Sequence, residues 1–156
     1  MPIKEFTFEH GLTQKFMDLG HEIYRGDDNW IPPIRGDLAR QLGPDFPFYR
    51  KAGNSHRKFV AVSGGKVHGR IAAMVNCDLK TGEGEQIGTL GFFECINDYH
   101  VARDLIGASL QWLSGEMGVS HVWGPMNFDI WHGYRFMTKG FDQDDFRNPL
   151  FLFNIF

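Results

Sequence analysis

Residues 87–117 read IGTLGFFECINDYHVARDLIGASLQWLSGEM and place an apolar segment directly before a long amphipathic one. The apolar run Ile87–Ile96 predicts a buried strand. Asn97 or Asp98 can then cap a helix that runs to about Met117. The apolar stripe of this helix recurs at helical spacing: Val101, Ala102, Leu105, Ile106, Ser109, Trp112 and Leu113. A strand followed by a one-sided helix predicts an α/β fold in which the helix packs on a sheet.

The N-terminal segment predicts one strand and two helices. Residues 3–8 alternate as a strand does. The next apolar residues recur at steps of four, three and four, as on one face of a helix: Leu12, Phe16, Leu19 and Ile23. Residues 30–33, Trp-Ile-Pro-Pro, are expected to be extended, because proline disfavours a helical residue before it. A second, short helix is expected around Gly36–Leu42.

A hairpin is expected in the middle of the chain. Residues 57–62 and 66–75 are strand-like and flank Gly64-Gly65, a dipeptide suited to a tight turn. Residues 76–86 are polar, contain two glycines and are expected to form a loop. The sheet is thus expected to be antiparallel in its middle and parallel around the long helix.

The C-terminal part predicts three further elements: a strand at His121–Trp123, a short helix at Trp131–Lys139 and a final strand at Leu150–Phe156. That last strand is almost wholly apolar and has no polar tail. We therefore expect either a partner that covers it, as in a homodimer formed through this strand, or a chain that stops short of its natural end. All elements together are expected to form one domain over residues 1–156.

Composition excludes several classes of protein. The 156 residues are 42% hydrophobic and 22% charged, which is typical of a folded globular chain. The net charge of −3, with acids and bases mixed, argues against a nucleic-acid partner. No apolar run approaches the ~20 residues that a membrane helix requires. The two cysteines have no metal-ligand spacing, so we expect a reduced, cytoplasmic protein.

Five short blocks carry a resemblance to a known family. Val67-His-Gly-Arg-Ile-Ala-Ala73, Gly91-Phe-Phe-Glu94 and the capped helix after it, Gly124-Pro-Met-Asn127 and Gly140-Phe141 occur in this order. In this order and with these element lengths, the chain resembles the GNAT (GCN5-related N-acetyltransferase) superfamily, and within it a poorly characterised GNAT-like group. The resemblance implies an acyl-CoA N-acyltransferase fold, with a mixed central sheet flanked by helices and its last strand possibly missing.

The resemblance also implies where acyl-CoA binds. Pantetheine would pair with the backbone of Glu94, Cys95 and Ile96. The pyrophosphate would then meet the start of the following helix, where unpaired amides and the helix dipole favour an anion. The residues implied at that start are Asn97, Asp98, His100, Val101 and Arg103, with Arg103 and His100 contributing charge. No metal is implied.

Two departures from the family pattern concern phosphate binding and proton transfer. The glycine-containing phosphate loop is absent, and the chain reads Asn-Asp-Tyr-His-Val-Ala over residues 97–102. Many relatives place a tyrosine four residues before the Gly-Phe, as a general acid for the leaving thiolate. That position is Phe136 here, and Tyr134 lies two residues earlier. General acid–base help is worth about 10²–10⁴-fold, whereas orienting the two substrates can supply about 7–11 kcal/mol, so the loss does not exclude activity.

Three polar residues in these blocks have competing interpretations. Glu94 is the candidate general base for an acceptor amine, or else an edge-strand carboxylate. Asn127 follows the fifth strand, where it contacts coenzyme or acceptor, or else caps a turn. Arg70 lies in mid-strand, on the face opposite Ile71, and is interpreted as an ion-pair partner rather than a catalytic group.

Other reactive residues receive structural interpretations. His68, His121 and His132 show no metal-ligand spacing, so structural or solvent roles are favoured. Cys95 has no histidine placed in sequence to activate it and is interpreted as a buried thiol. Two aromatic, proline-stiffened stretches, residues 30–33 and 46–49, either pack as loops or shape an apolar acceptor or acyl pocket.

The functional expectation is acyl transfer from acetyl-CoA or another acyl-CoA, used as a co-substrate, directly to an amine. The acceptor is expected to be a small molecule or a peptide. The alternative is a catalytically silent domain that binds acyl-CoA or another protein, an interpretation favoured by the missing glycine loop and by Phe136.

Overall fold

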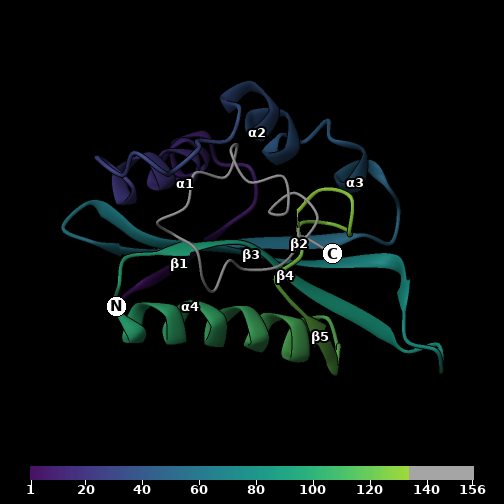
Figure 1. Ribbon diagram of the computed structural model, residues 1–156. Coiled ribbons are helices and arrows are strands. Elements are labelled where there is room, and N and C mark those ends of the chain that lie inside the picture. The colour runs from purple at the N-terminus through teal and green to yellow at the C-terminus, as the bar shows by residue number, and fades with distance from the viewer. Residues whose placement is uncertain (134–156) are drawn as a thin grey trace.

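A single mixed sheet organises the protein (Figure 1). The computed structural model describes residues 1–133, and the strands follow the order β1-β2-β3-β4-β5 across the sheet. Their bounds are β1 Ile3–Phe6, β2 Ser55–Ser63, β3 Lys66–Lys80, β4 Gln86–Cys95 and β5 His121–Trp123. The first four strands pair antiparallel and β5 joins β4 parallel, which confirms the predicted mixed topology.

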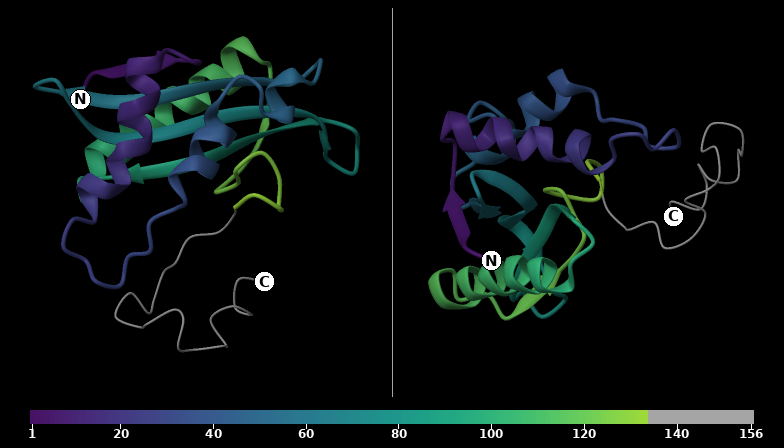
Figure 2. Two further views of the ribbon diagram at one scale, coloured as in Figure 1. Left: turned by 90° about the horizontal axis from the view of Figure 1, so that it is seen from above. Right: turned by 90° about the vertical axis from the view of Figure 1, so that its left-hand side faces the viewer.

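Helices cover both faces of this sheet (Figures 1 and 2). One face carries α1 His10–Ile23, α2 Arg35–Leu42 and the four-residue α3 Pro47–Arg50. The other face carries α4 Tyr99–Gln111, which continues as a π-helical turn over Trp112–Glu116. The long helix therefore ends close to the predicted Met117, but its last turn is wider than an α-helix.

Each face of the sheet has its own core. Alternation along β3 sends Ala72 and Met74 toward α1–α3, and Ile71 and Ala73 toward α4. Close approach on the α4 side depends on Gly69, where an added Cβ would lie 2.6 Å from Leu105 Cδ1. The two-sided burial explains why β3 reads as an almost continuous apolar run.

The junction between β4 and α4 forms as the sequence predicts. Asp98 Oδ1 accepts a hydrogen bond of 2.8 Å from the amide of His100, so Asp98 is the helix cap. The Gly64-Gly65 turn of the β2–β3 hairpin is confirmed as well, with φ angles of 57° and 77°.

Three predicted boundaries are wrong. Residues 76–80 extend β3 rather than forming a loop, because Gln86 pairs with Lys80 and its side-chain amide donates to the carbonyl of Asn76 at 2.7 Å. Residues 47–50 form α3, since Pro47 suits the first turn of a helix. Residues 131–133 form a turn and not the start of a helix.

Residues 134–156 lie outside the described part of the chain. The rest of the helix predicted at 131–139, the strand predicted at Leu150–Phe156, and the positions of Phe136 and Tyr134 therefore stay predictions. Over residues 1–133, no helix is both long enough and apolar enough to cross a membrane.

Candidate functional site

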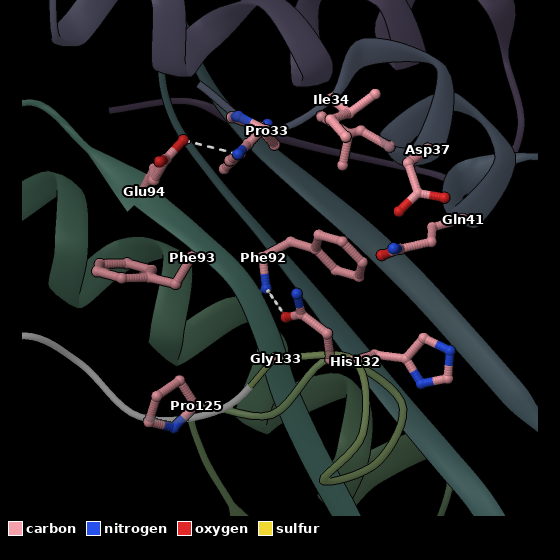
Figure 3. Close-up of a pocket in the computed structure, with 13 residues that line it drawn as sticks. Pro33, Ile34, Asp37, Gln41, Phe92, Phe93, Glu94, Pro125, His132 and Gly133 are labelled. Carbon is pink, nitrogen blue, oxygen red and sulfur yellow. Dashed lines mark hydrogen bonds and ion pairs between the residues drawn. The ribbon is translucent and has the colours of Figure 1, made fainter. Parts of the chain in front are cut away.

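A bulge in β4 creates the irregularity around which the site forms. Arg70 of β3 pairs with Glu94, and Ala72 pairs with Gly91, so that Phe92 and Phe93 together oppose a single residue of β3. Phe92 has a φ of 53°. Figure 3 shows the two rings pointing apart, Phe92 into the cavity and Phe93 toward the α4 side. The bulge therefore reorients the end of β4.

The neighbouring strand leaves β4 at the same point. Pairing with β5 ends at Thr89 and Trp123, and one further bond of 2.7 Å joins the Met126 amide to the Leu90 carbonyl. The chain then crosses Gly91 so closely that a Cβ there would lie 2.4 Å from Met126 O. Glycine is required at position 91, and beyond it β4 has no parallel neighbour among residues 1–133.

Asn127 holds the departing chain against the bulge. Its side-chain Oδ1 accepts a hydrogen bond of 2.7 Å from the backbone amide of Phe92, and its backbone amide donates to the Gly133 carbonyl at 2.7 Å. These bonds fix a compact loop over residues 127–133 beside the opened strand. The side-chain oxygen of Asn127 is thus engaged by the protein, and its predicted contact with coenzyme or acceptor stays a prediction.

A cavity of about 400 Å³ occupies the opening between β4, α2 and this loop (Figure 3). Its floor is the bulge, one wall is α2 with the two residues before it, and the other wall is the segment after β5. Its lining consists of Pro33, Ile34, Asp37, Leu38, Gln41, Arg70, Phe92, Phe93, Glu94, Pro125, Asn127, His132 and Gly133. Glu94 and Asn127, both singled out in the sequence, are thereby brought to one site.

Glu94 forms a largely buried ion pair with Arg70 at one side of this cavity. Arg70 Nη2 lies 2.7 Å from Glu94 Oε2, and the Arg70 side chain is 7% exposed. Arg70 also donates through Nη1 to the Phe16 carbonyl of α1. The predicted ion-pair role of Arg70 is confirmed, although the face it occupies is buried under α1 and is not polar.

The Glu94 carboxyl titrates in an environment that opposes its charge. Burial raises its pKa above the ordinary value, and the Arg70 guanidinium offsets only part of this effect. A carboxylate with a raised pKa is a stronger base than an exposed one, which suits proton abstraction. Whether Glu94 acts as that base stays a prediction.

Aromatic side chains from α1 and the segment after it lie over Glu94. An added Cβ at Gly20 would lie 3.1 Å from Glu94 Oε2 and 3.2 Å from the Trp30 ring, so Gly20 leaves room for both. Trp30 stacks on Tyr24 with ring centroids 5.1 Å apart and meets His21 edge-on. Residues 30–33 thus contribute to the cover of the site, while Phe46 and Phe48 of the second aromatic stretch pack into the core.

The residues implied in coenzyme binding follow one another along the chain, from the end of β4 to the start of α4. Ile96 continues the ladder by donating to the His68 carbonyl at 2.9 Å. Burial raises the pKa of the Cys95 thiol, and Asp98 raises it further, which accords with a thiol that is not activated as a nucleophile. Asn97 connects the two elements.

The first turn of α4 offers free amides but few free charges. Asp98 pairs with the His100 amide, and within residues 1–133 no acceptor is recorded for the amides of Tyr99 and Val101. The Val101 side chain is buried in the α4 core. Arg103 pairs with Asp104 at 2.8 Å, so its charge is partly compensated.

A histidine for which the sequence favoured only a structural or solvent role lines the cavity. His132 lines it, and its Nδ1 lies 2.7 Å from Asp129 Oδ1, which also accepts the Trp131 amide at 2.8 Å. The His132 ring packs edge-on against Phe46 and Phe128, with centroids 5.4 and 5.5 Å away. The D-x-x-H spacing was visible in the sequence, but only the loop closure between Asn127 and Gly133 brings the pair to the cavity.

No metal centre is formed by the part of the chain described. Within residues 1–133, histidine, cysteine and acidic side chains do not gather in groups of three or more that could hold a metal ion.

Solved structures share this fold. Aminoglycoside N-acetyltransferase AAC(6')-Iy in complex with CoA superposes with a TM-score of 0.56 at 16% identity, over 80% of this chain and 76% of that one. The protein has the GNAT acetyltransferase fold. Among other GNAT structures, an aminoglycoside acetyltransferase from an uncultured soil metagenomic sample, in complex with sisomicin, gives a TM-score of 0.54 at 15% identity over 80% and 76% of the two chains. Ribosomal-protein-alanine N-acetyltransferase from Brucella melitensis biovar Abortus 2308 gives 0.51 at 14% identity over 78% and 77%.

Sequence comparison gives one curated relative of this GNAT-fold chain. Protein YghO of Escherichia coli (strain K12) is 29% identical over 143 residues, which are 90% of this chain and 35% of that protein. The chain thus spans about a third of the length of this relative. No family model matches the chain.

Proposed function

We propose that the protein transfers an acyl group from acetyl-CoA or another acyl-CoA directly to an amine. The observation that carries this proposal is the end of β4, which separates from β5 at a bulge and leads straight into the start of α4. The separation leaves a cavity of about 400 Å³ beside a buried carboxyl group. The fold is that of acetyltransferases, one of them solved in complex with CoA.

Acyl-CoA would lie along the strand end and the helix start. Pantetheine amides would pair with the backbone of the β4 end at Glu94 and Cys95, because the parallel neighbour of β4 ends at Trp123. The chain of the coenzyme would then pass Ile96, whose own amide donates to the His68 carbonyl. The pyrophosphate then meets the amides of Tyr99 and Val101 at the positive end of the α4 dipole. The acyl thioester is thereby placed at the bulge, at the floor of the cavity.

Glu94 would accept a proton from the acceptor. The amine nitrogen attacks the thioester carbonyl carbon, a C–N bond forms, and the C–S bond breaks as sulfur leaves with its electron pair. The amine proton passes to Glu94 directly or through water, and the CoA thiolate is protonated by solvent. Arg70 holds the carboxylate in place through the 2.7 Å ion pair, so that its orientation is fixed before the acceptor enters.

A small acceptor suits the cavity. Its volume of about 400 Å³ lies at the lower end of the range for small-molecule sites, about 300–1,000 Å³. A structural neighbour solved in complex with sisomicin also supports a small-molecule amine, whereas the ribosomal-protein-alanine enzyme supports a peptide amine. Both classes belong in the test.

The test measures coenzyme binding first and turnover second. Isothermal titration with acetyl-CoA should give saturable binding at one site per chain. Release of free CoA thiol is then followed over a panel of small amines and peptide amino termini, and at least one amine should accelerate it above hydrolysis. Glu94→Gln should lower kcat for that amine about 10²–10⁴-fold while acetyl-CoA still binds.

Each outcome has a definite meaning. Binding without turnover over the whole panel would contradict the proposed transfer and leave a silent coenzyme-binding domain. Absence of binding would contradict the coenzyme itself.

A further inference from the structure

The side of the cavity away from Glu94 has a chemistry that the transfer reaction does not use. Figure 3 shows Glu94 on one side, His132 on the other, and the Phe92 ring between them. Asp37 and Gln41 of α2 line the cavity on the same side of the view as His132. The apolar Phe92 ring thus separates two polar ends of the cavity.

Asp129 fixes the hydrogen-bonding character of His132. A ring nitrogen 2.7 Å from a carboxylate oxygen carries the proton, which leaves Nε2 of the neutral ring with a lone pair. The Trp131 amide holds the same carboxylate oxygen, and the Phe46 and Phe128 rings hold the imidazole. Within the described residues, no hydrogen bond is recorded for His132 Nε2. His132 is therefore a pre-oriented acceptor in the cavity wall.

The charges around His132 also favour a donor group. Asp37 is half exposed and pairs with Arg40 at 2.7 Å, so it contributes a partly compensated negative charge. On the other side of the cavity, the charges of Glu94 and Arg70 compensate each other. Gln41 can donate or accept. The net charge at the His132 end of the cavity is therefore weakly negative, which disfavours an anionic ligand there.

We propose that this end is an acceptor subsite, in which His132 Nε2 accepts a hydrogen bond from a second polar group of the acceptor. The acceptor would then be a small amine with a hydrogen-bond donor, a hydroxyl or an ammonium group, separated from the reacting nitrogen by an apolar stretch. The inference rests on the proposed function for the identity of the reacting group. His132 is a specificity-determining residue here and takes no part in the proton transfer.

The kinetic test compares linear alkylamines of increasing length with the amino alcohols and the diamines of the same lengths. At the length that spans the cavity, the KM for an amine with a terminal donor should be about threefold to tenfold lower than for the plain alkylamine, as expected for one hydrogen bond. The amino alcohols and the diamines identify whether hydroxyl or ammonium is preferred.

His132→Phe is the decisive variant, because a phenyl ring retains the packing between Phe46 and Phe128 and removes both ring nitrogens. It should abolish the preference for donor-bearing amines, so that their KM no longer lies below that of the alkylamine of the same length. Asp129→Asn should weaken the preference, since the amide no longer fixes the tautomer. His121→Gln is the control: His121 also lies 3.1 Å from a carboxylate, that of Glu85, but it is on the surface outside the cavity.

A second readout does not depend on turnover. Long-range ¹H–¹⁵N correlation spectra should show His132 with its proton on Nδ1. The His132 signal is identified as the one that is missing from the spectrum of His132→Phe. A diamine or an amino alcohol should shift this signal. Equal KM values for all amines in the wild type, or an unchanged preference in His132→Phe, would overturn the subsite. If no amine supports turnover, the proposed transfer fails, and an unshifted His132 signal then overturns the subsite separately.

Discussion

Replacing Arg70 by Met tests the ion pair that positions Glu94. Arg70 is 6% exposed and binds both the Glu94 carboxylate and the Phe16 carbonyl. The variant keeps an unbranched, apolar side chain at this position but leaves the Glu94 charge without a partner. Water reaches Glu94 only in part, because its side chain is 21% exposed.

The expected loss follows from that arrangement. Removing one partner of a buried pair costs about 3–5 kcal/mol, and the residual exposure of Glu94 places the loss near the lower end, at about 3 kcal/mol. The loss should shrink toward pH 5. Without Arg70, the pKa of Glu94 rises further in the folded state. At pH values above the ordinary pKa of a glutamate, the folded protein then binds more protons than the unfolded chain, so its stability falls as the pH rises.

Urea denaturation followed by tryptophan fluorescence at pH 5 and pH 7.5 measures both effects. Arg57→Met is the matched control, because Arg57 pairs with Glu5 and Glu116, carboxylates that stay solvated, and this variant should lose only about 1 kcal/mol at either pH. Replacing both members of the buried pair, as in Arg70→Met with Glu94→Leu, should recover much of the loss. A loss below about 1 kcal/mol, or one that is the same at both pH values, would refute the buried-pair interpretation.

Three further predictions concern other parts of the molecule. Lys58 is wholly buried among the rings of Phe6, Phe8 and Tyr49, and burial lowers its pKa to about 8. Because the unfolded chain binds more protons than the folded protein between about pH 8 and 10.5, the free energy of unfolding should rise by up to about 3 kcal/mol over that range. Urea titrations measure this rise, which should be absent from Lys58→Met. Gly91→Ala should cost about 1–3 kcal/mol by overpacking against Met126 O and should weaken acetyl-CoA binding in calorimetry, whereas Gly107→Ala, which meets no atom within 4 Å, should not destabilise the protein. Asp98→Asn retains a capping side chain but removes a negative charge from the start of α4, so acetyl-CoA affinity should rise a few-fold at low salt; an unchanged or lower affinity would place the phosphates elsewhere.

Local patterns were sufficient to predict most of the architecture. The Asp98 cap, the Gly64-Gly65 turn and the helical stripe of α4 each depend on residues close in sequence, and each is confirmed. Arg70 was correctly interpreted as an ion-pair partner, although its face of β3 is buried under α1 rather than polar.

The geometry of the site depends on contacts that a single sequence does not encode locally. The bulge at Phe92 arises where the Met126–Asn127 segment crosses Gly91, and the only local signal was a glycine inside a strand pattern. His132 reaches the cavity because the backbone amide of Asn127 donates to the Gly133 carbonyl and closes the loop that follows β5. The burial of Lys58 is likewise a tertiary effect, since lysine is ordinarily a surface residue.

A crystal structure with bound CoA tests the central claim most directly. The account predicts pantetheine along the backbone of Glu94–Ile96, its sulfur at the Phe92–Phe93 bulge, and pyrophosphate oxygens within hydrogen-bonding distance of the Tyr99 and Val101 amides. CoA bound away from β4, or a crystal grown with saturating CoA in which the β4 edge and the start of α4 carry no ligand, would contradict it.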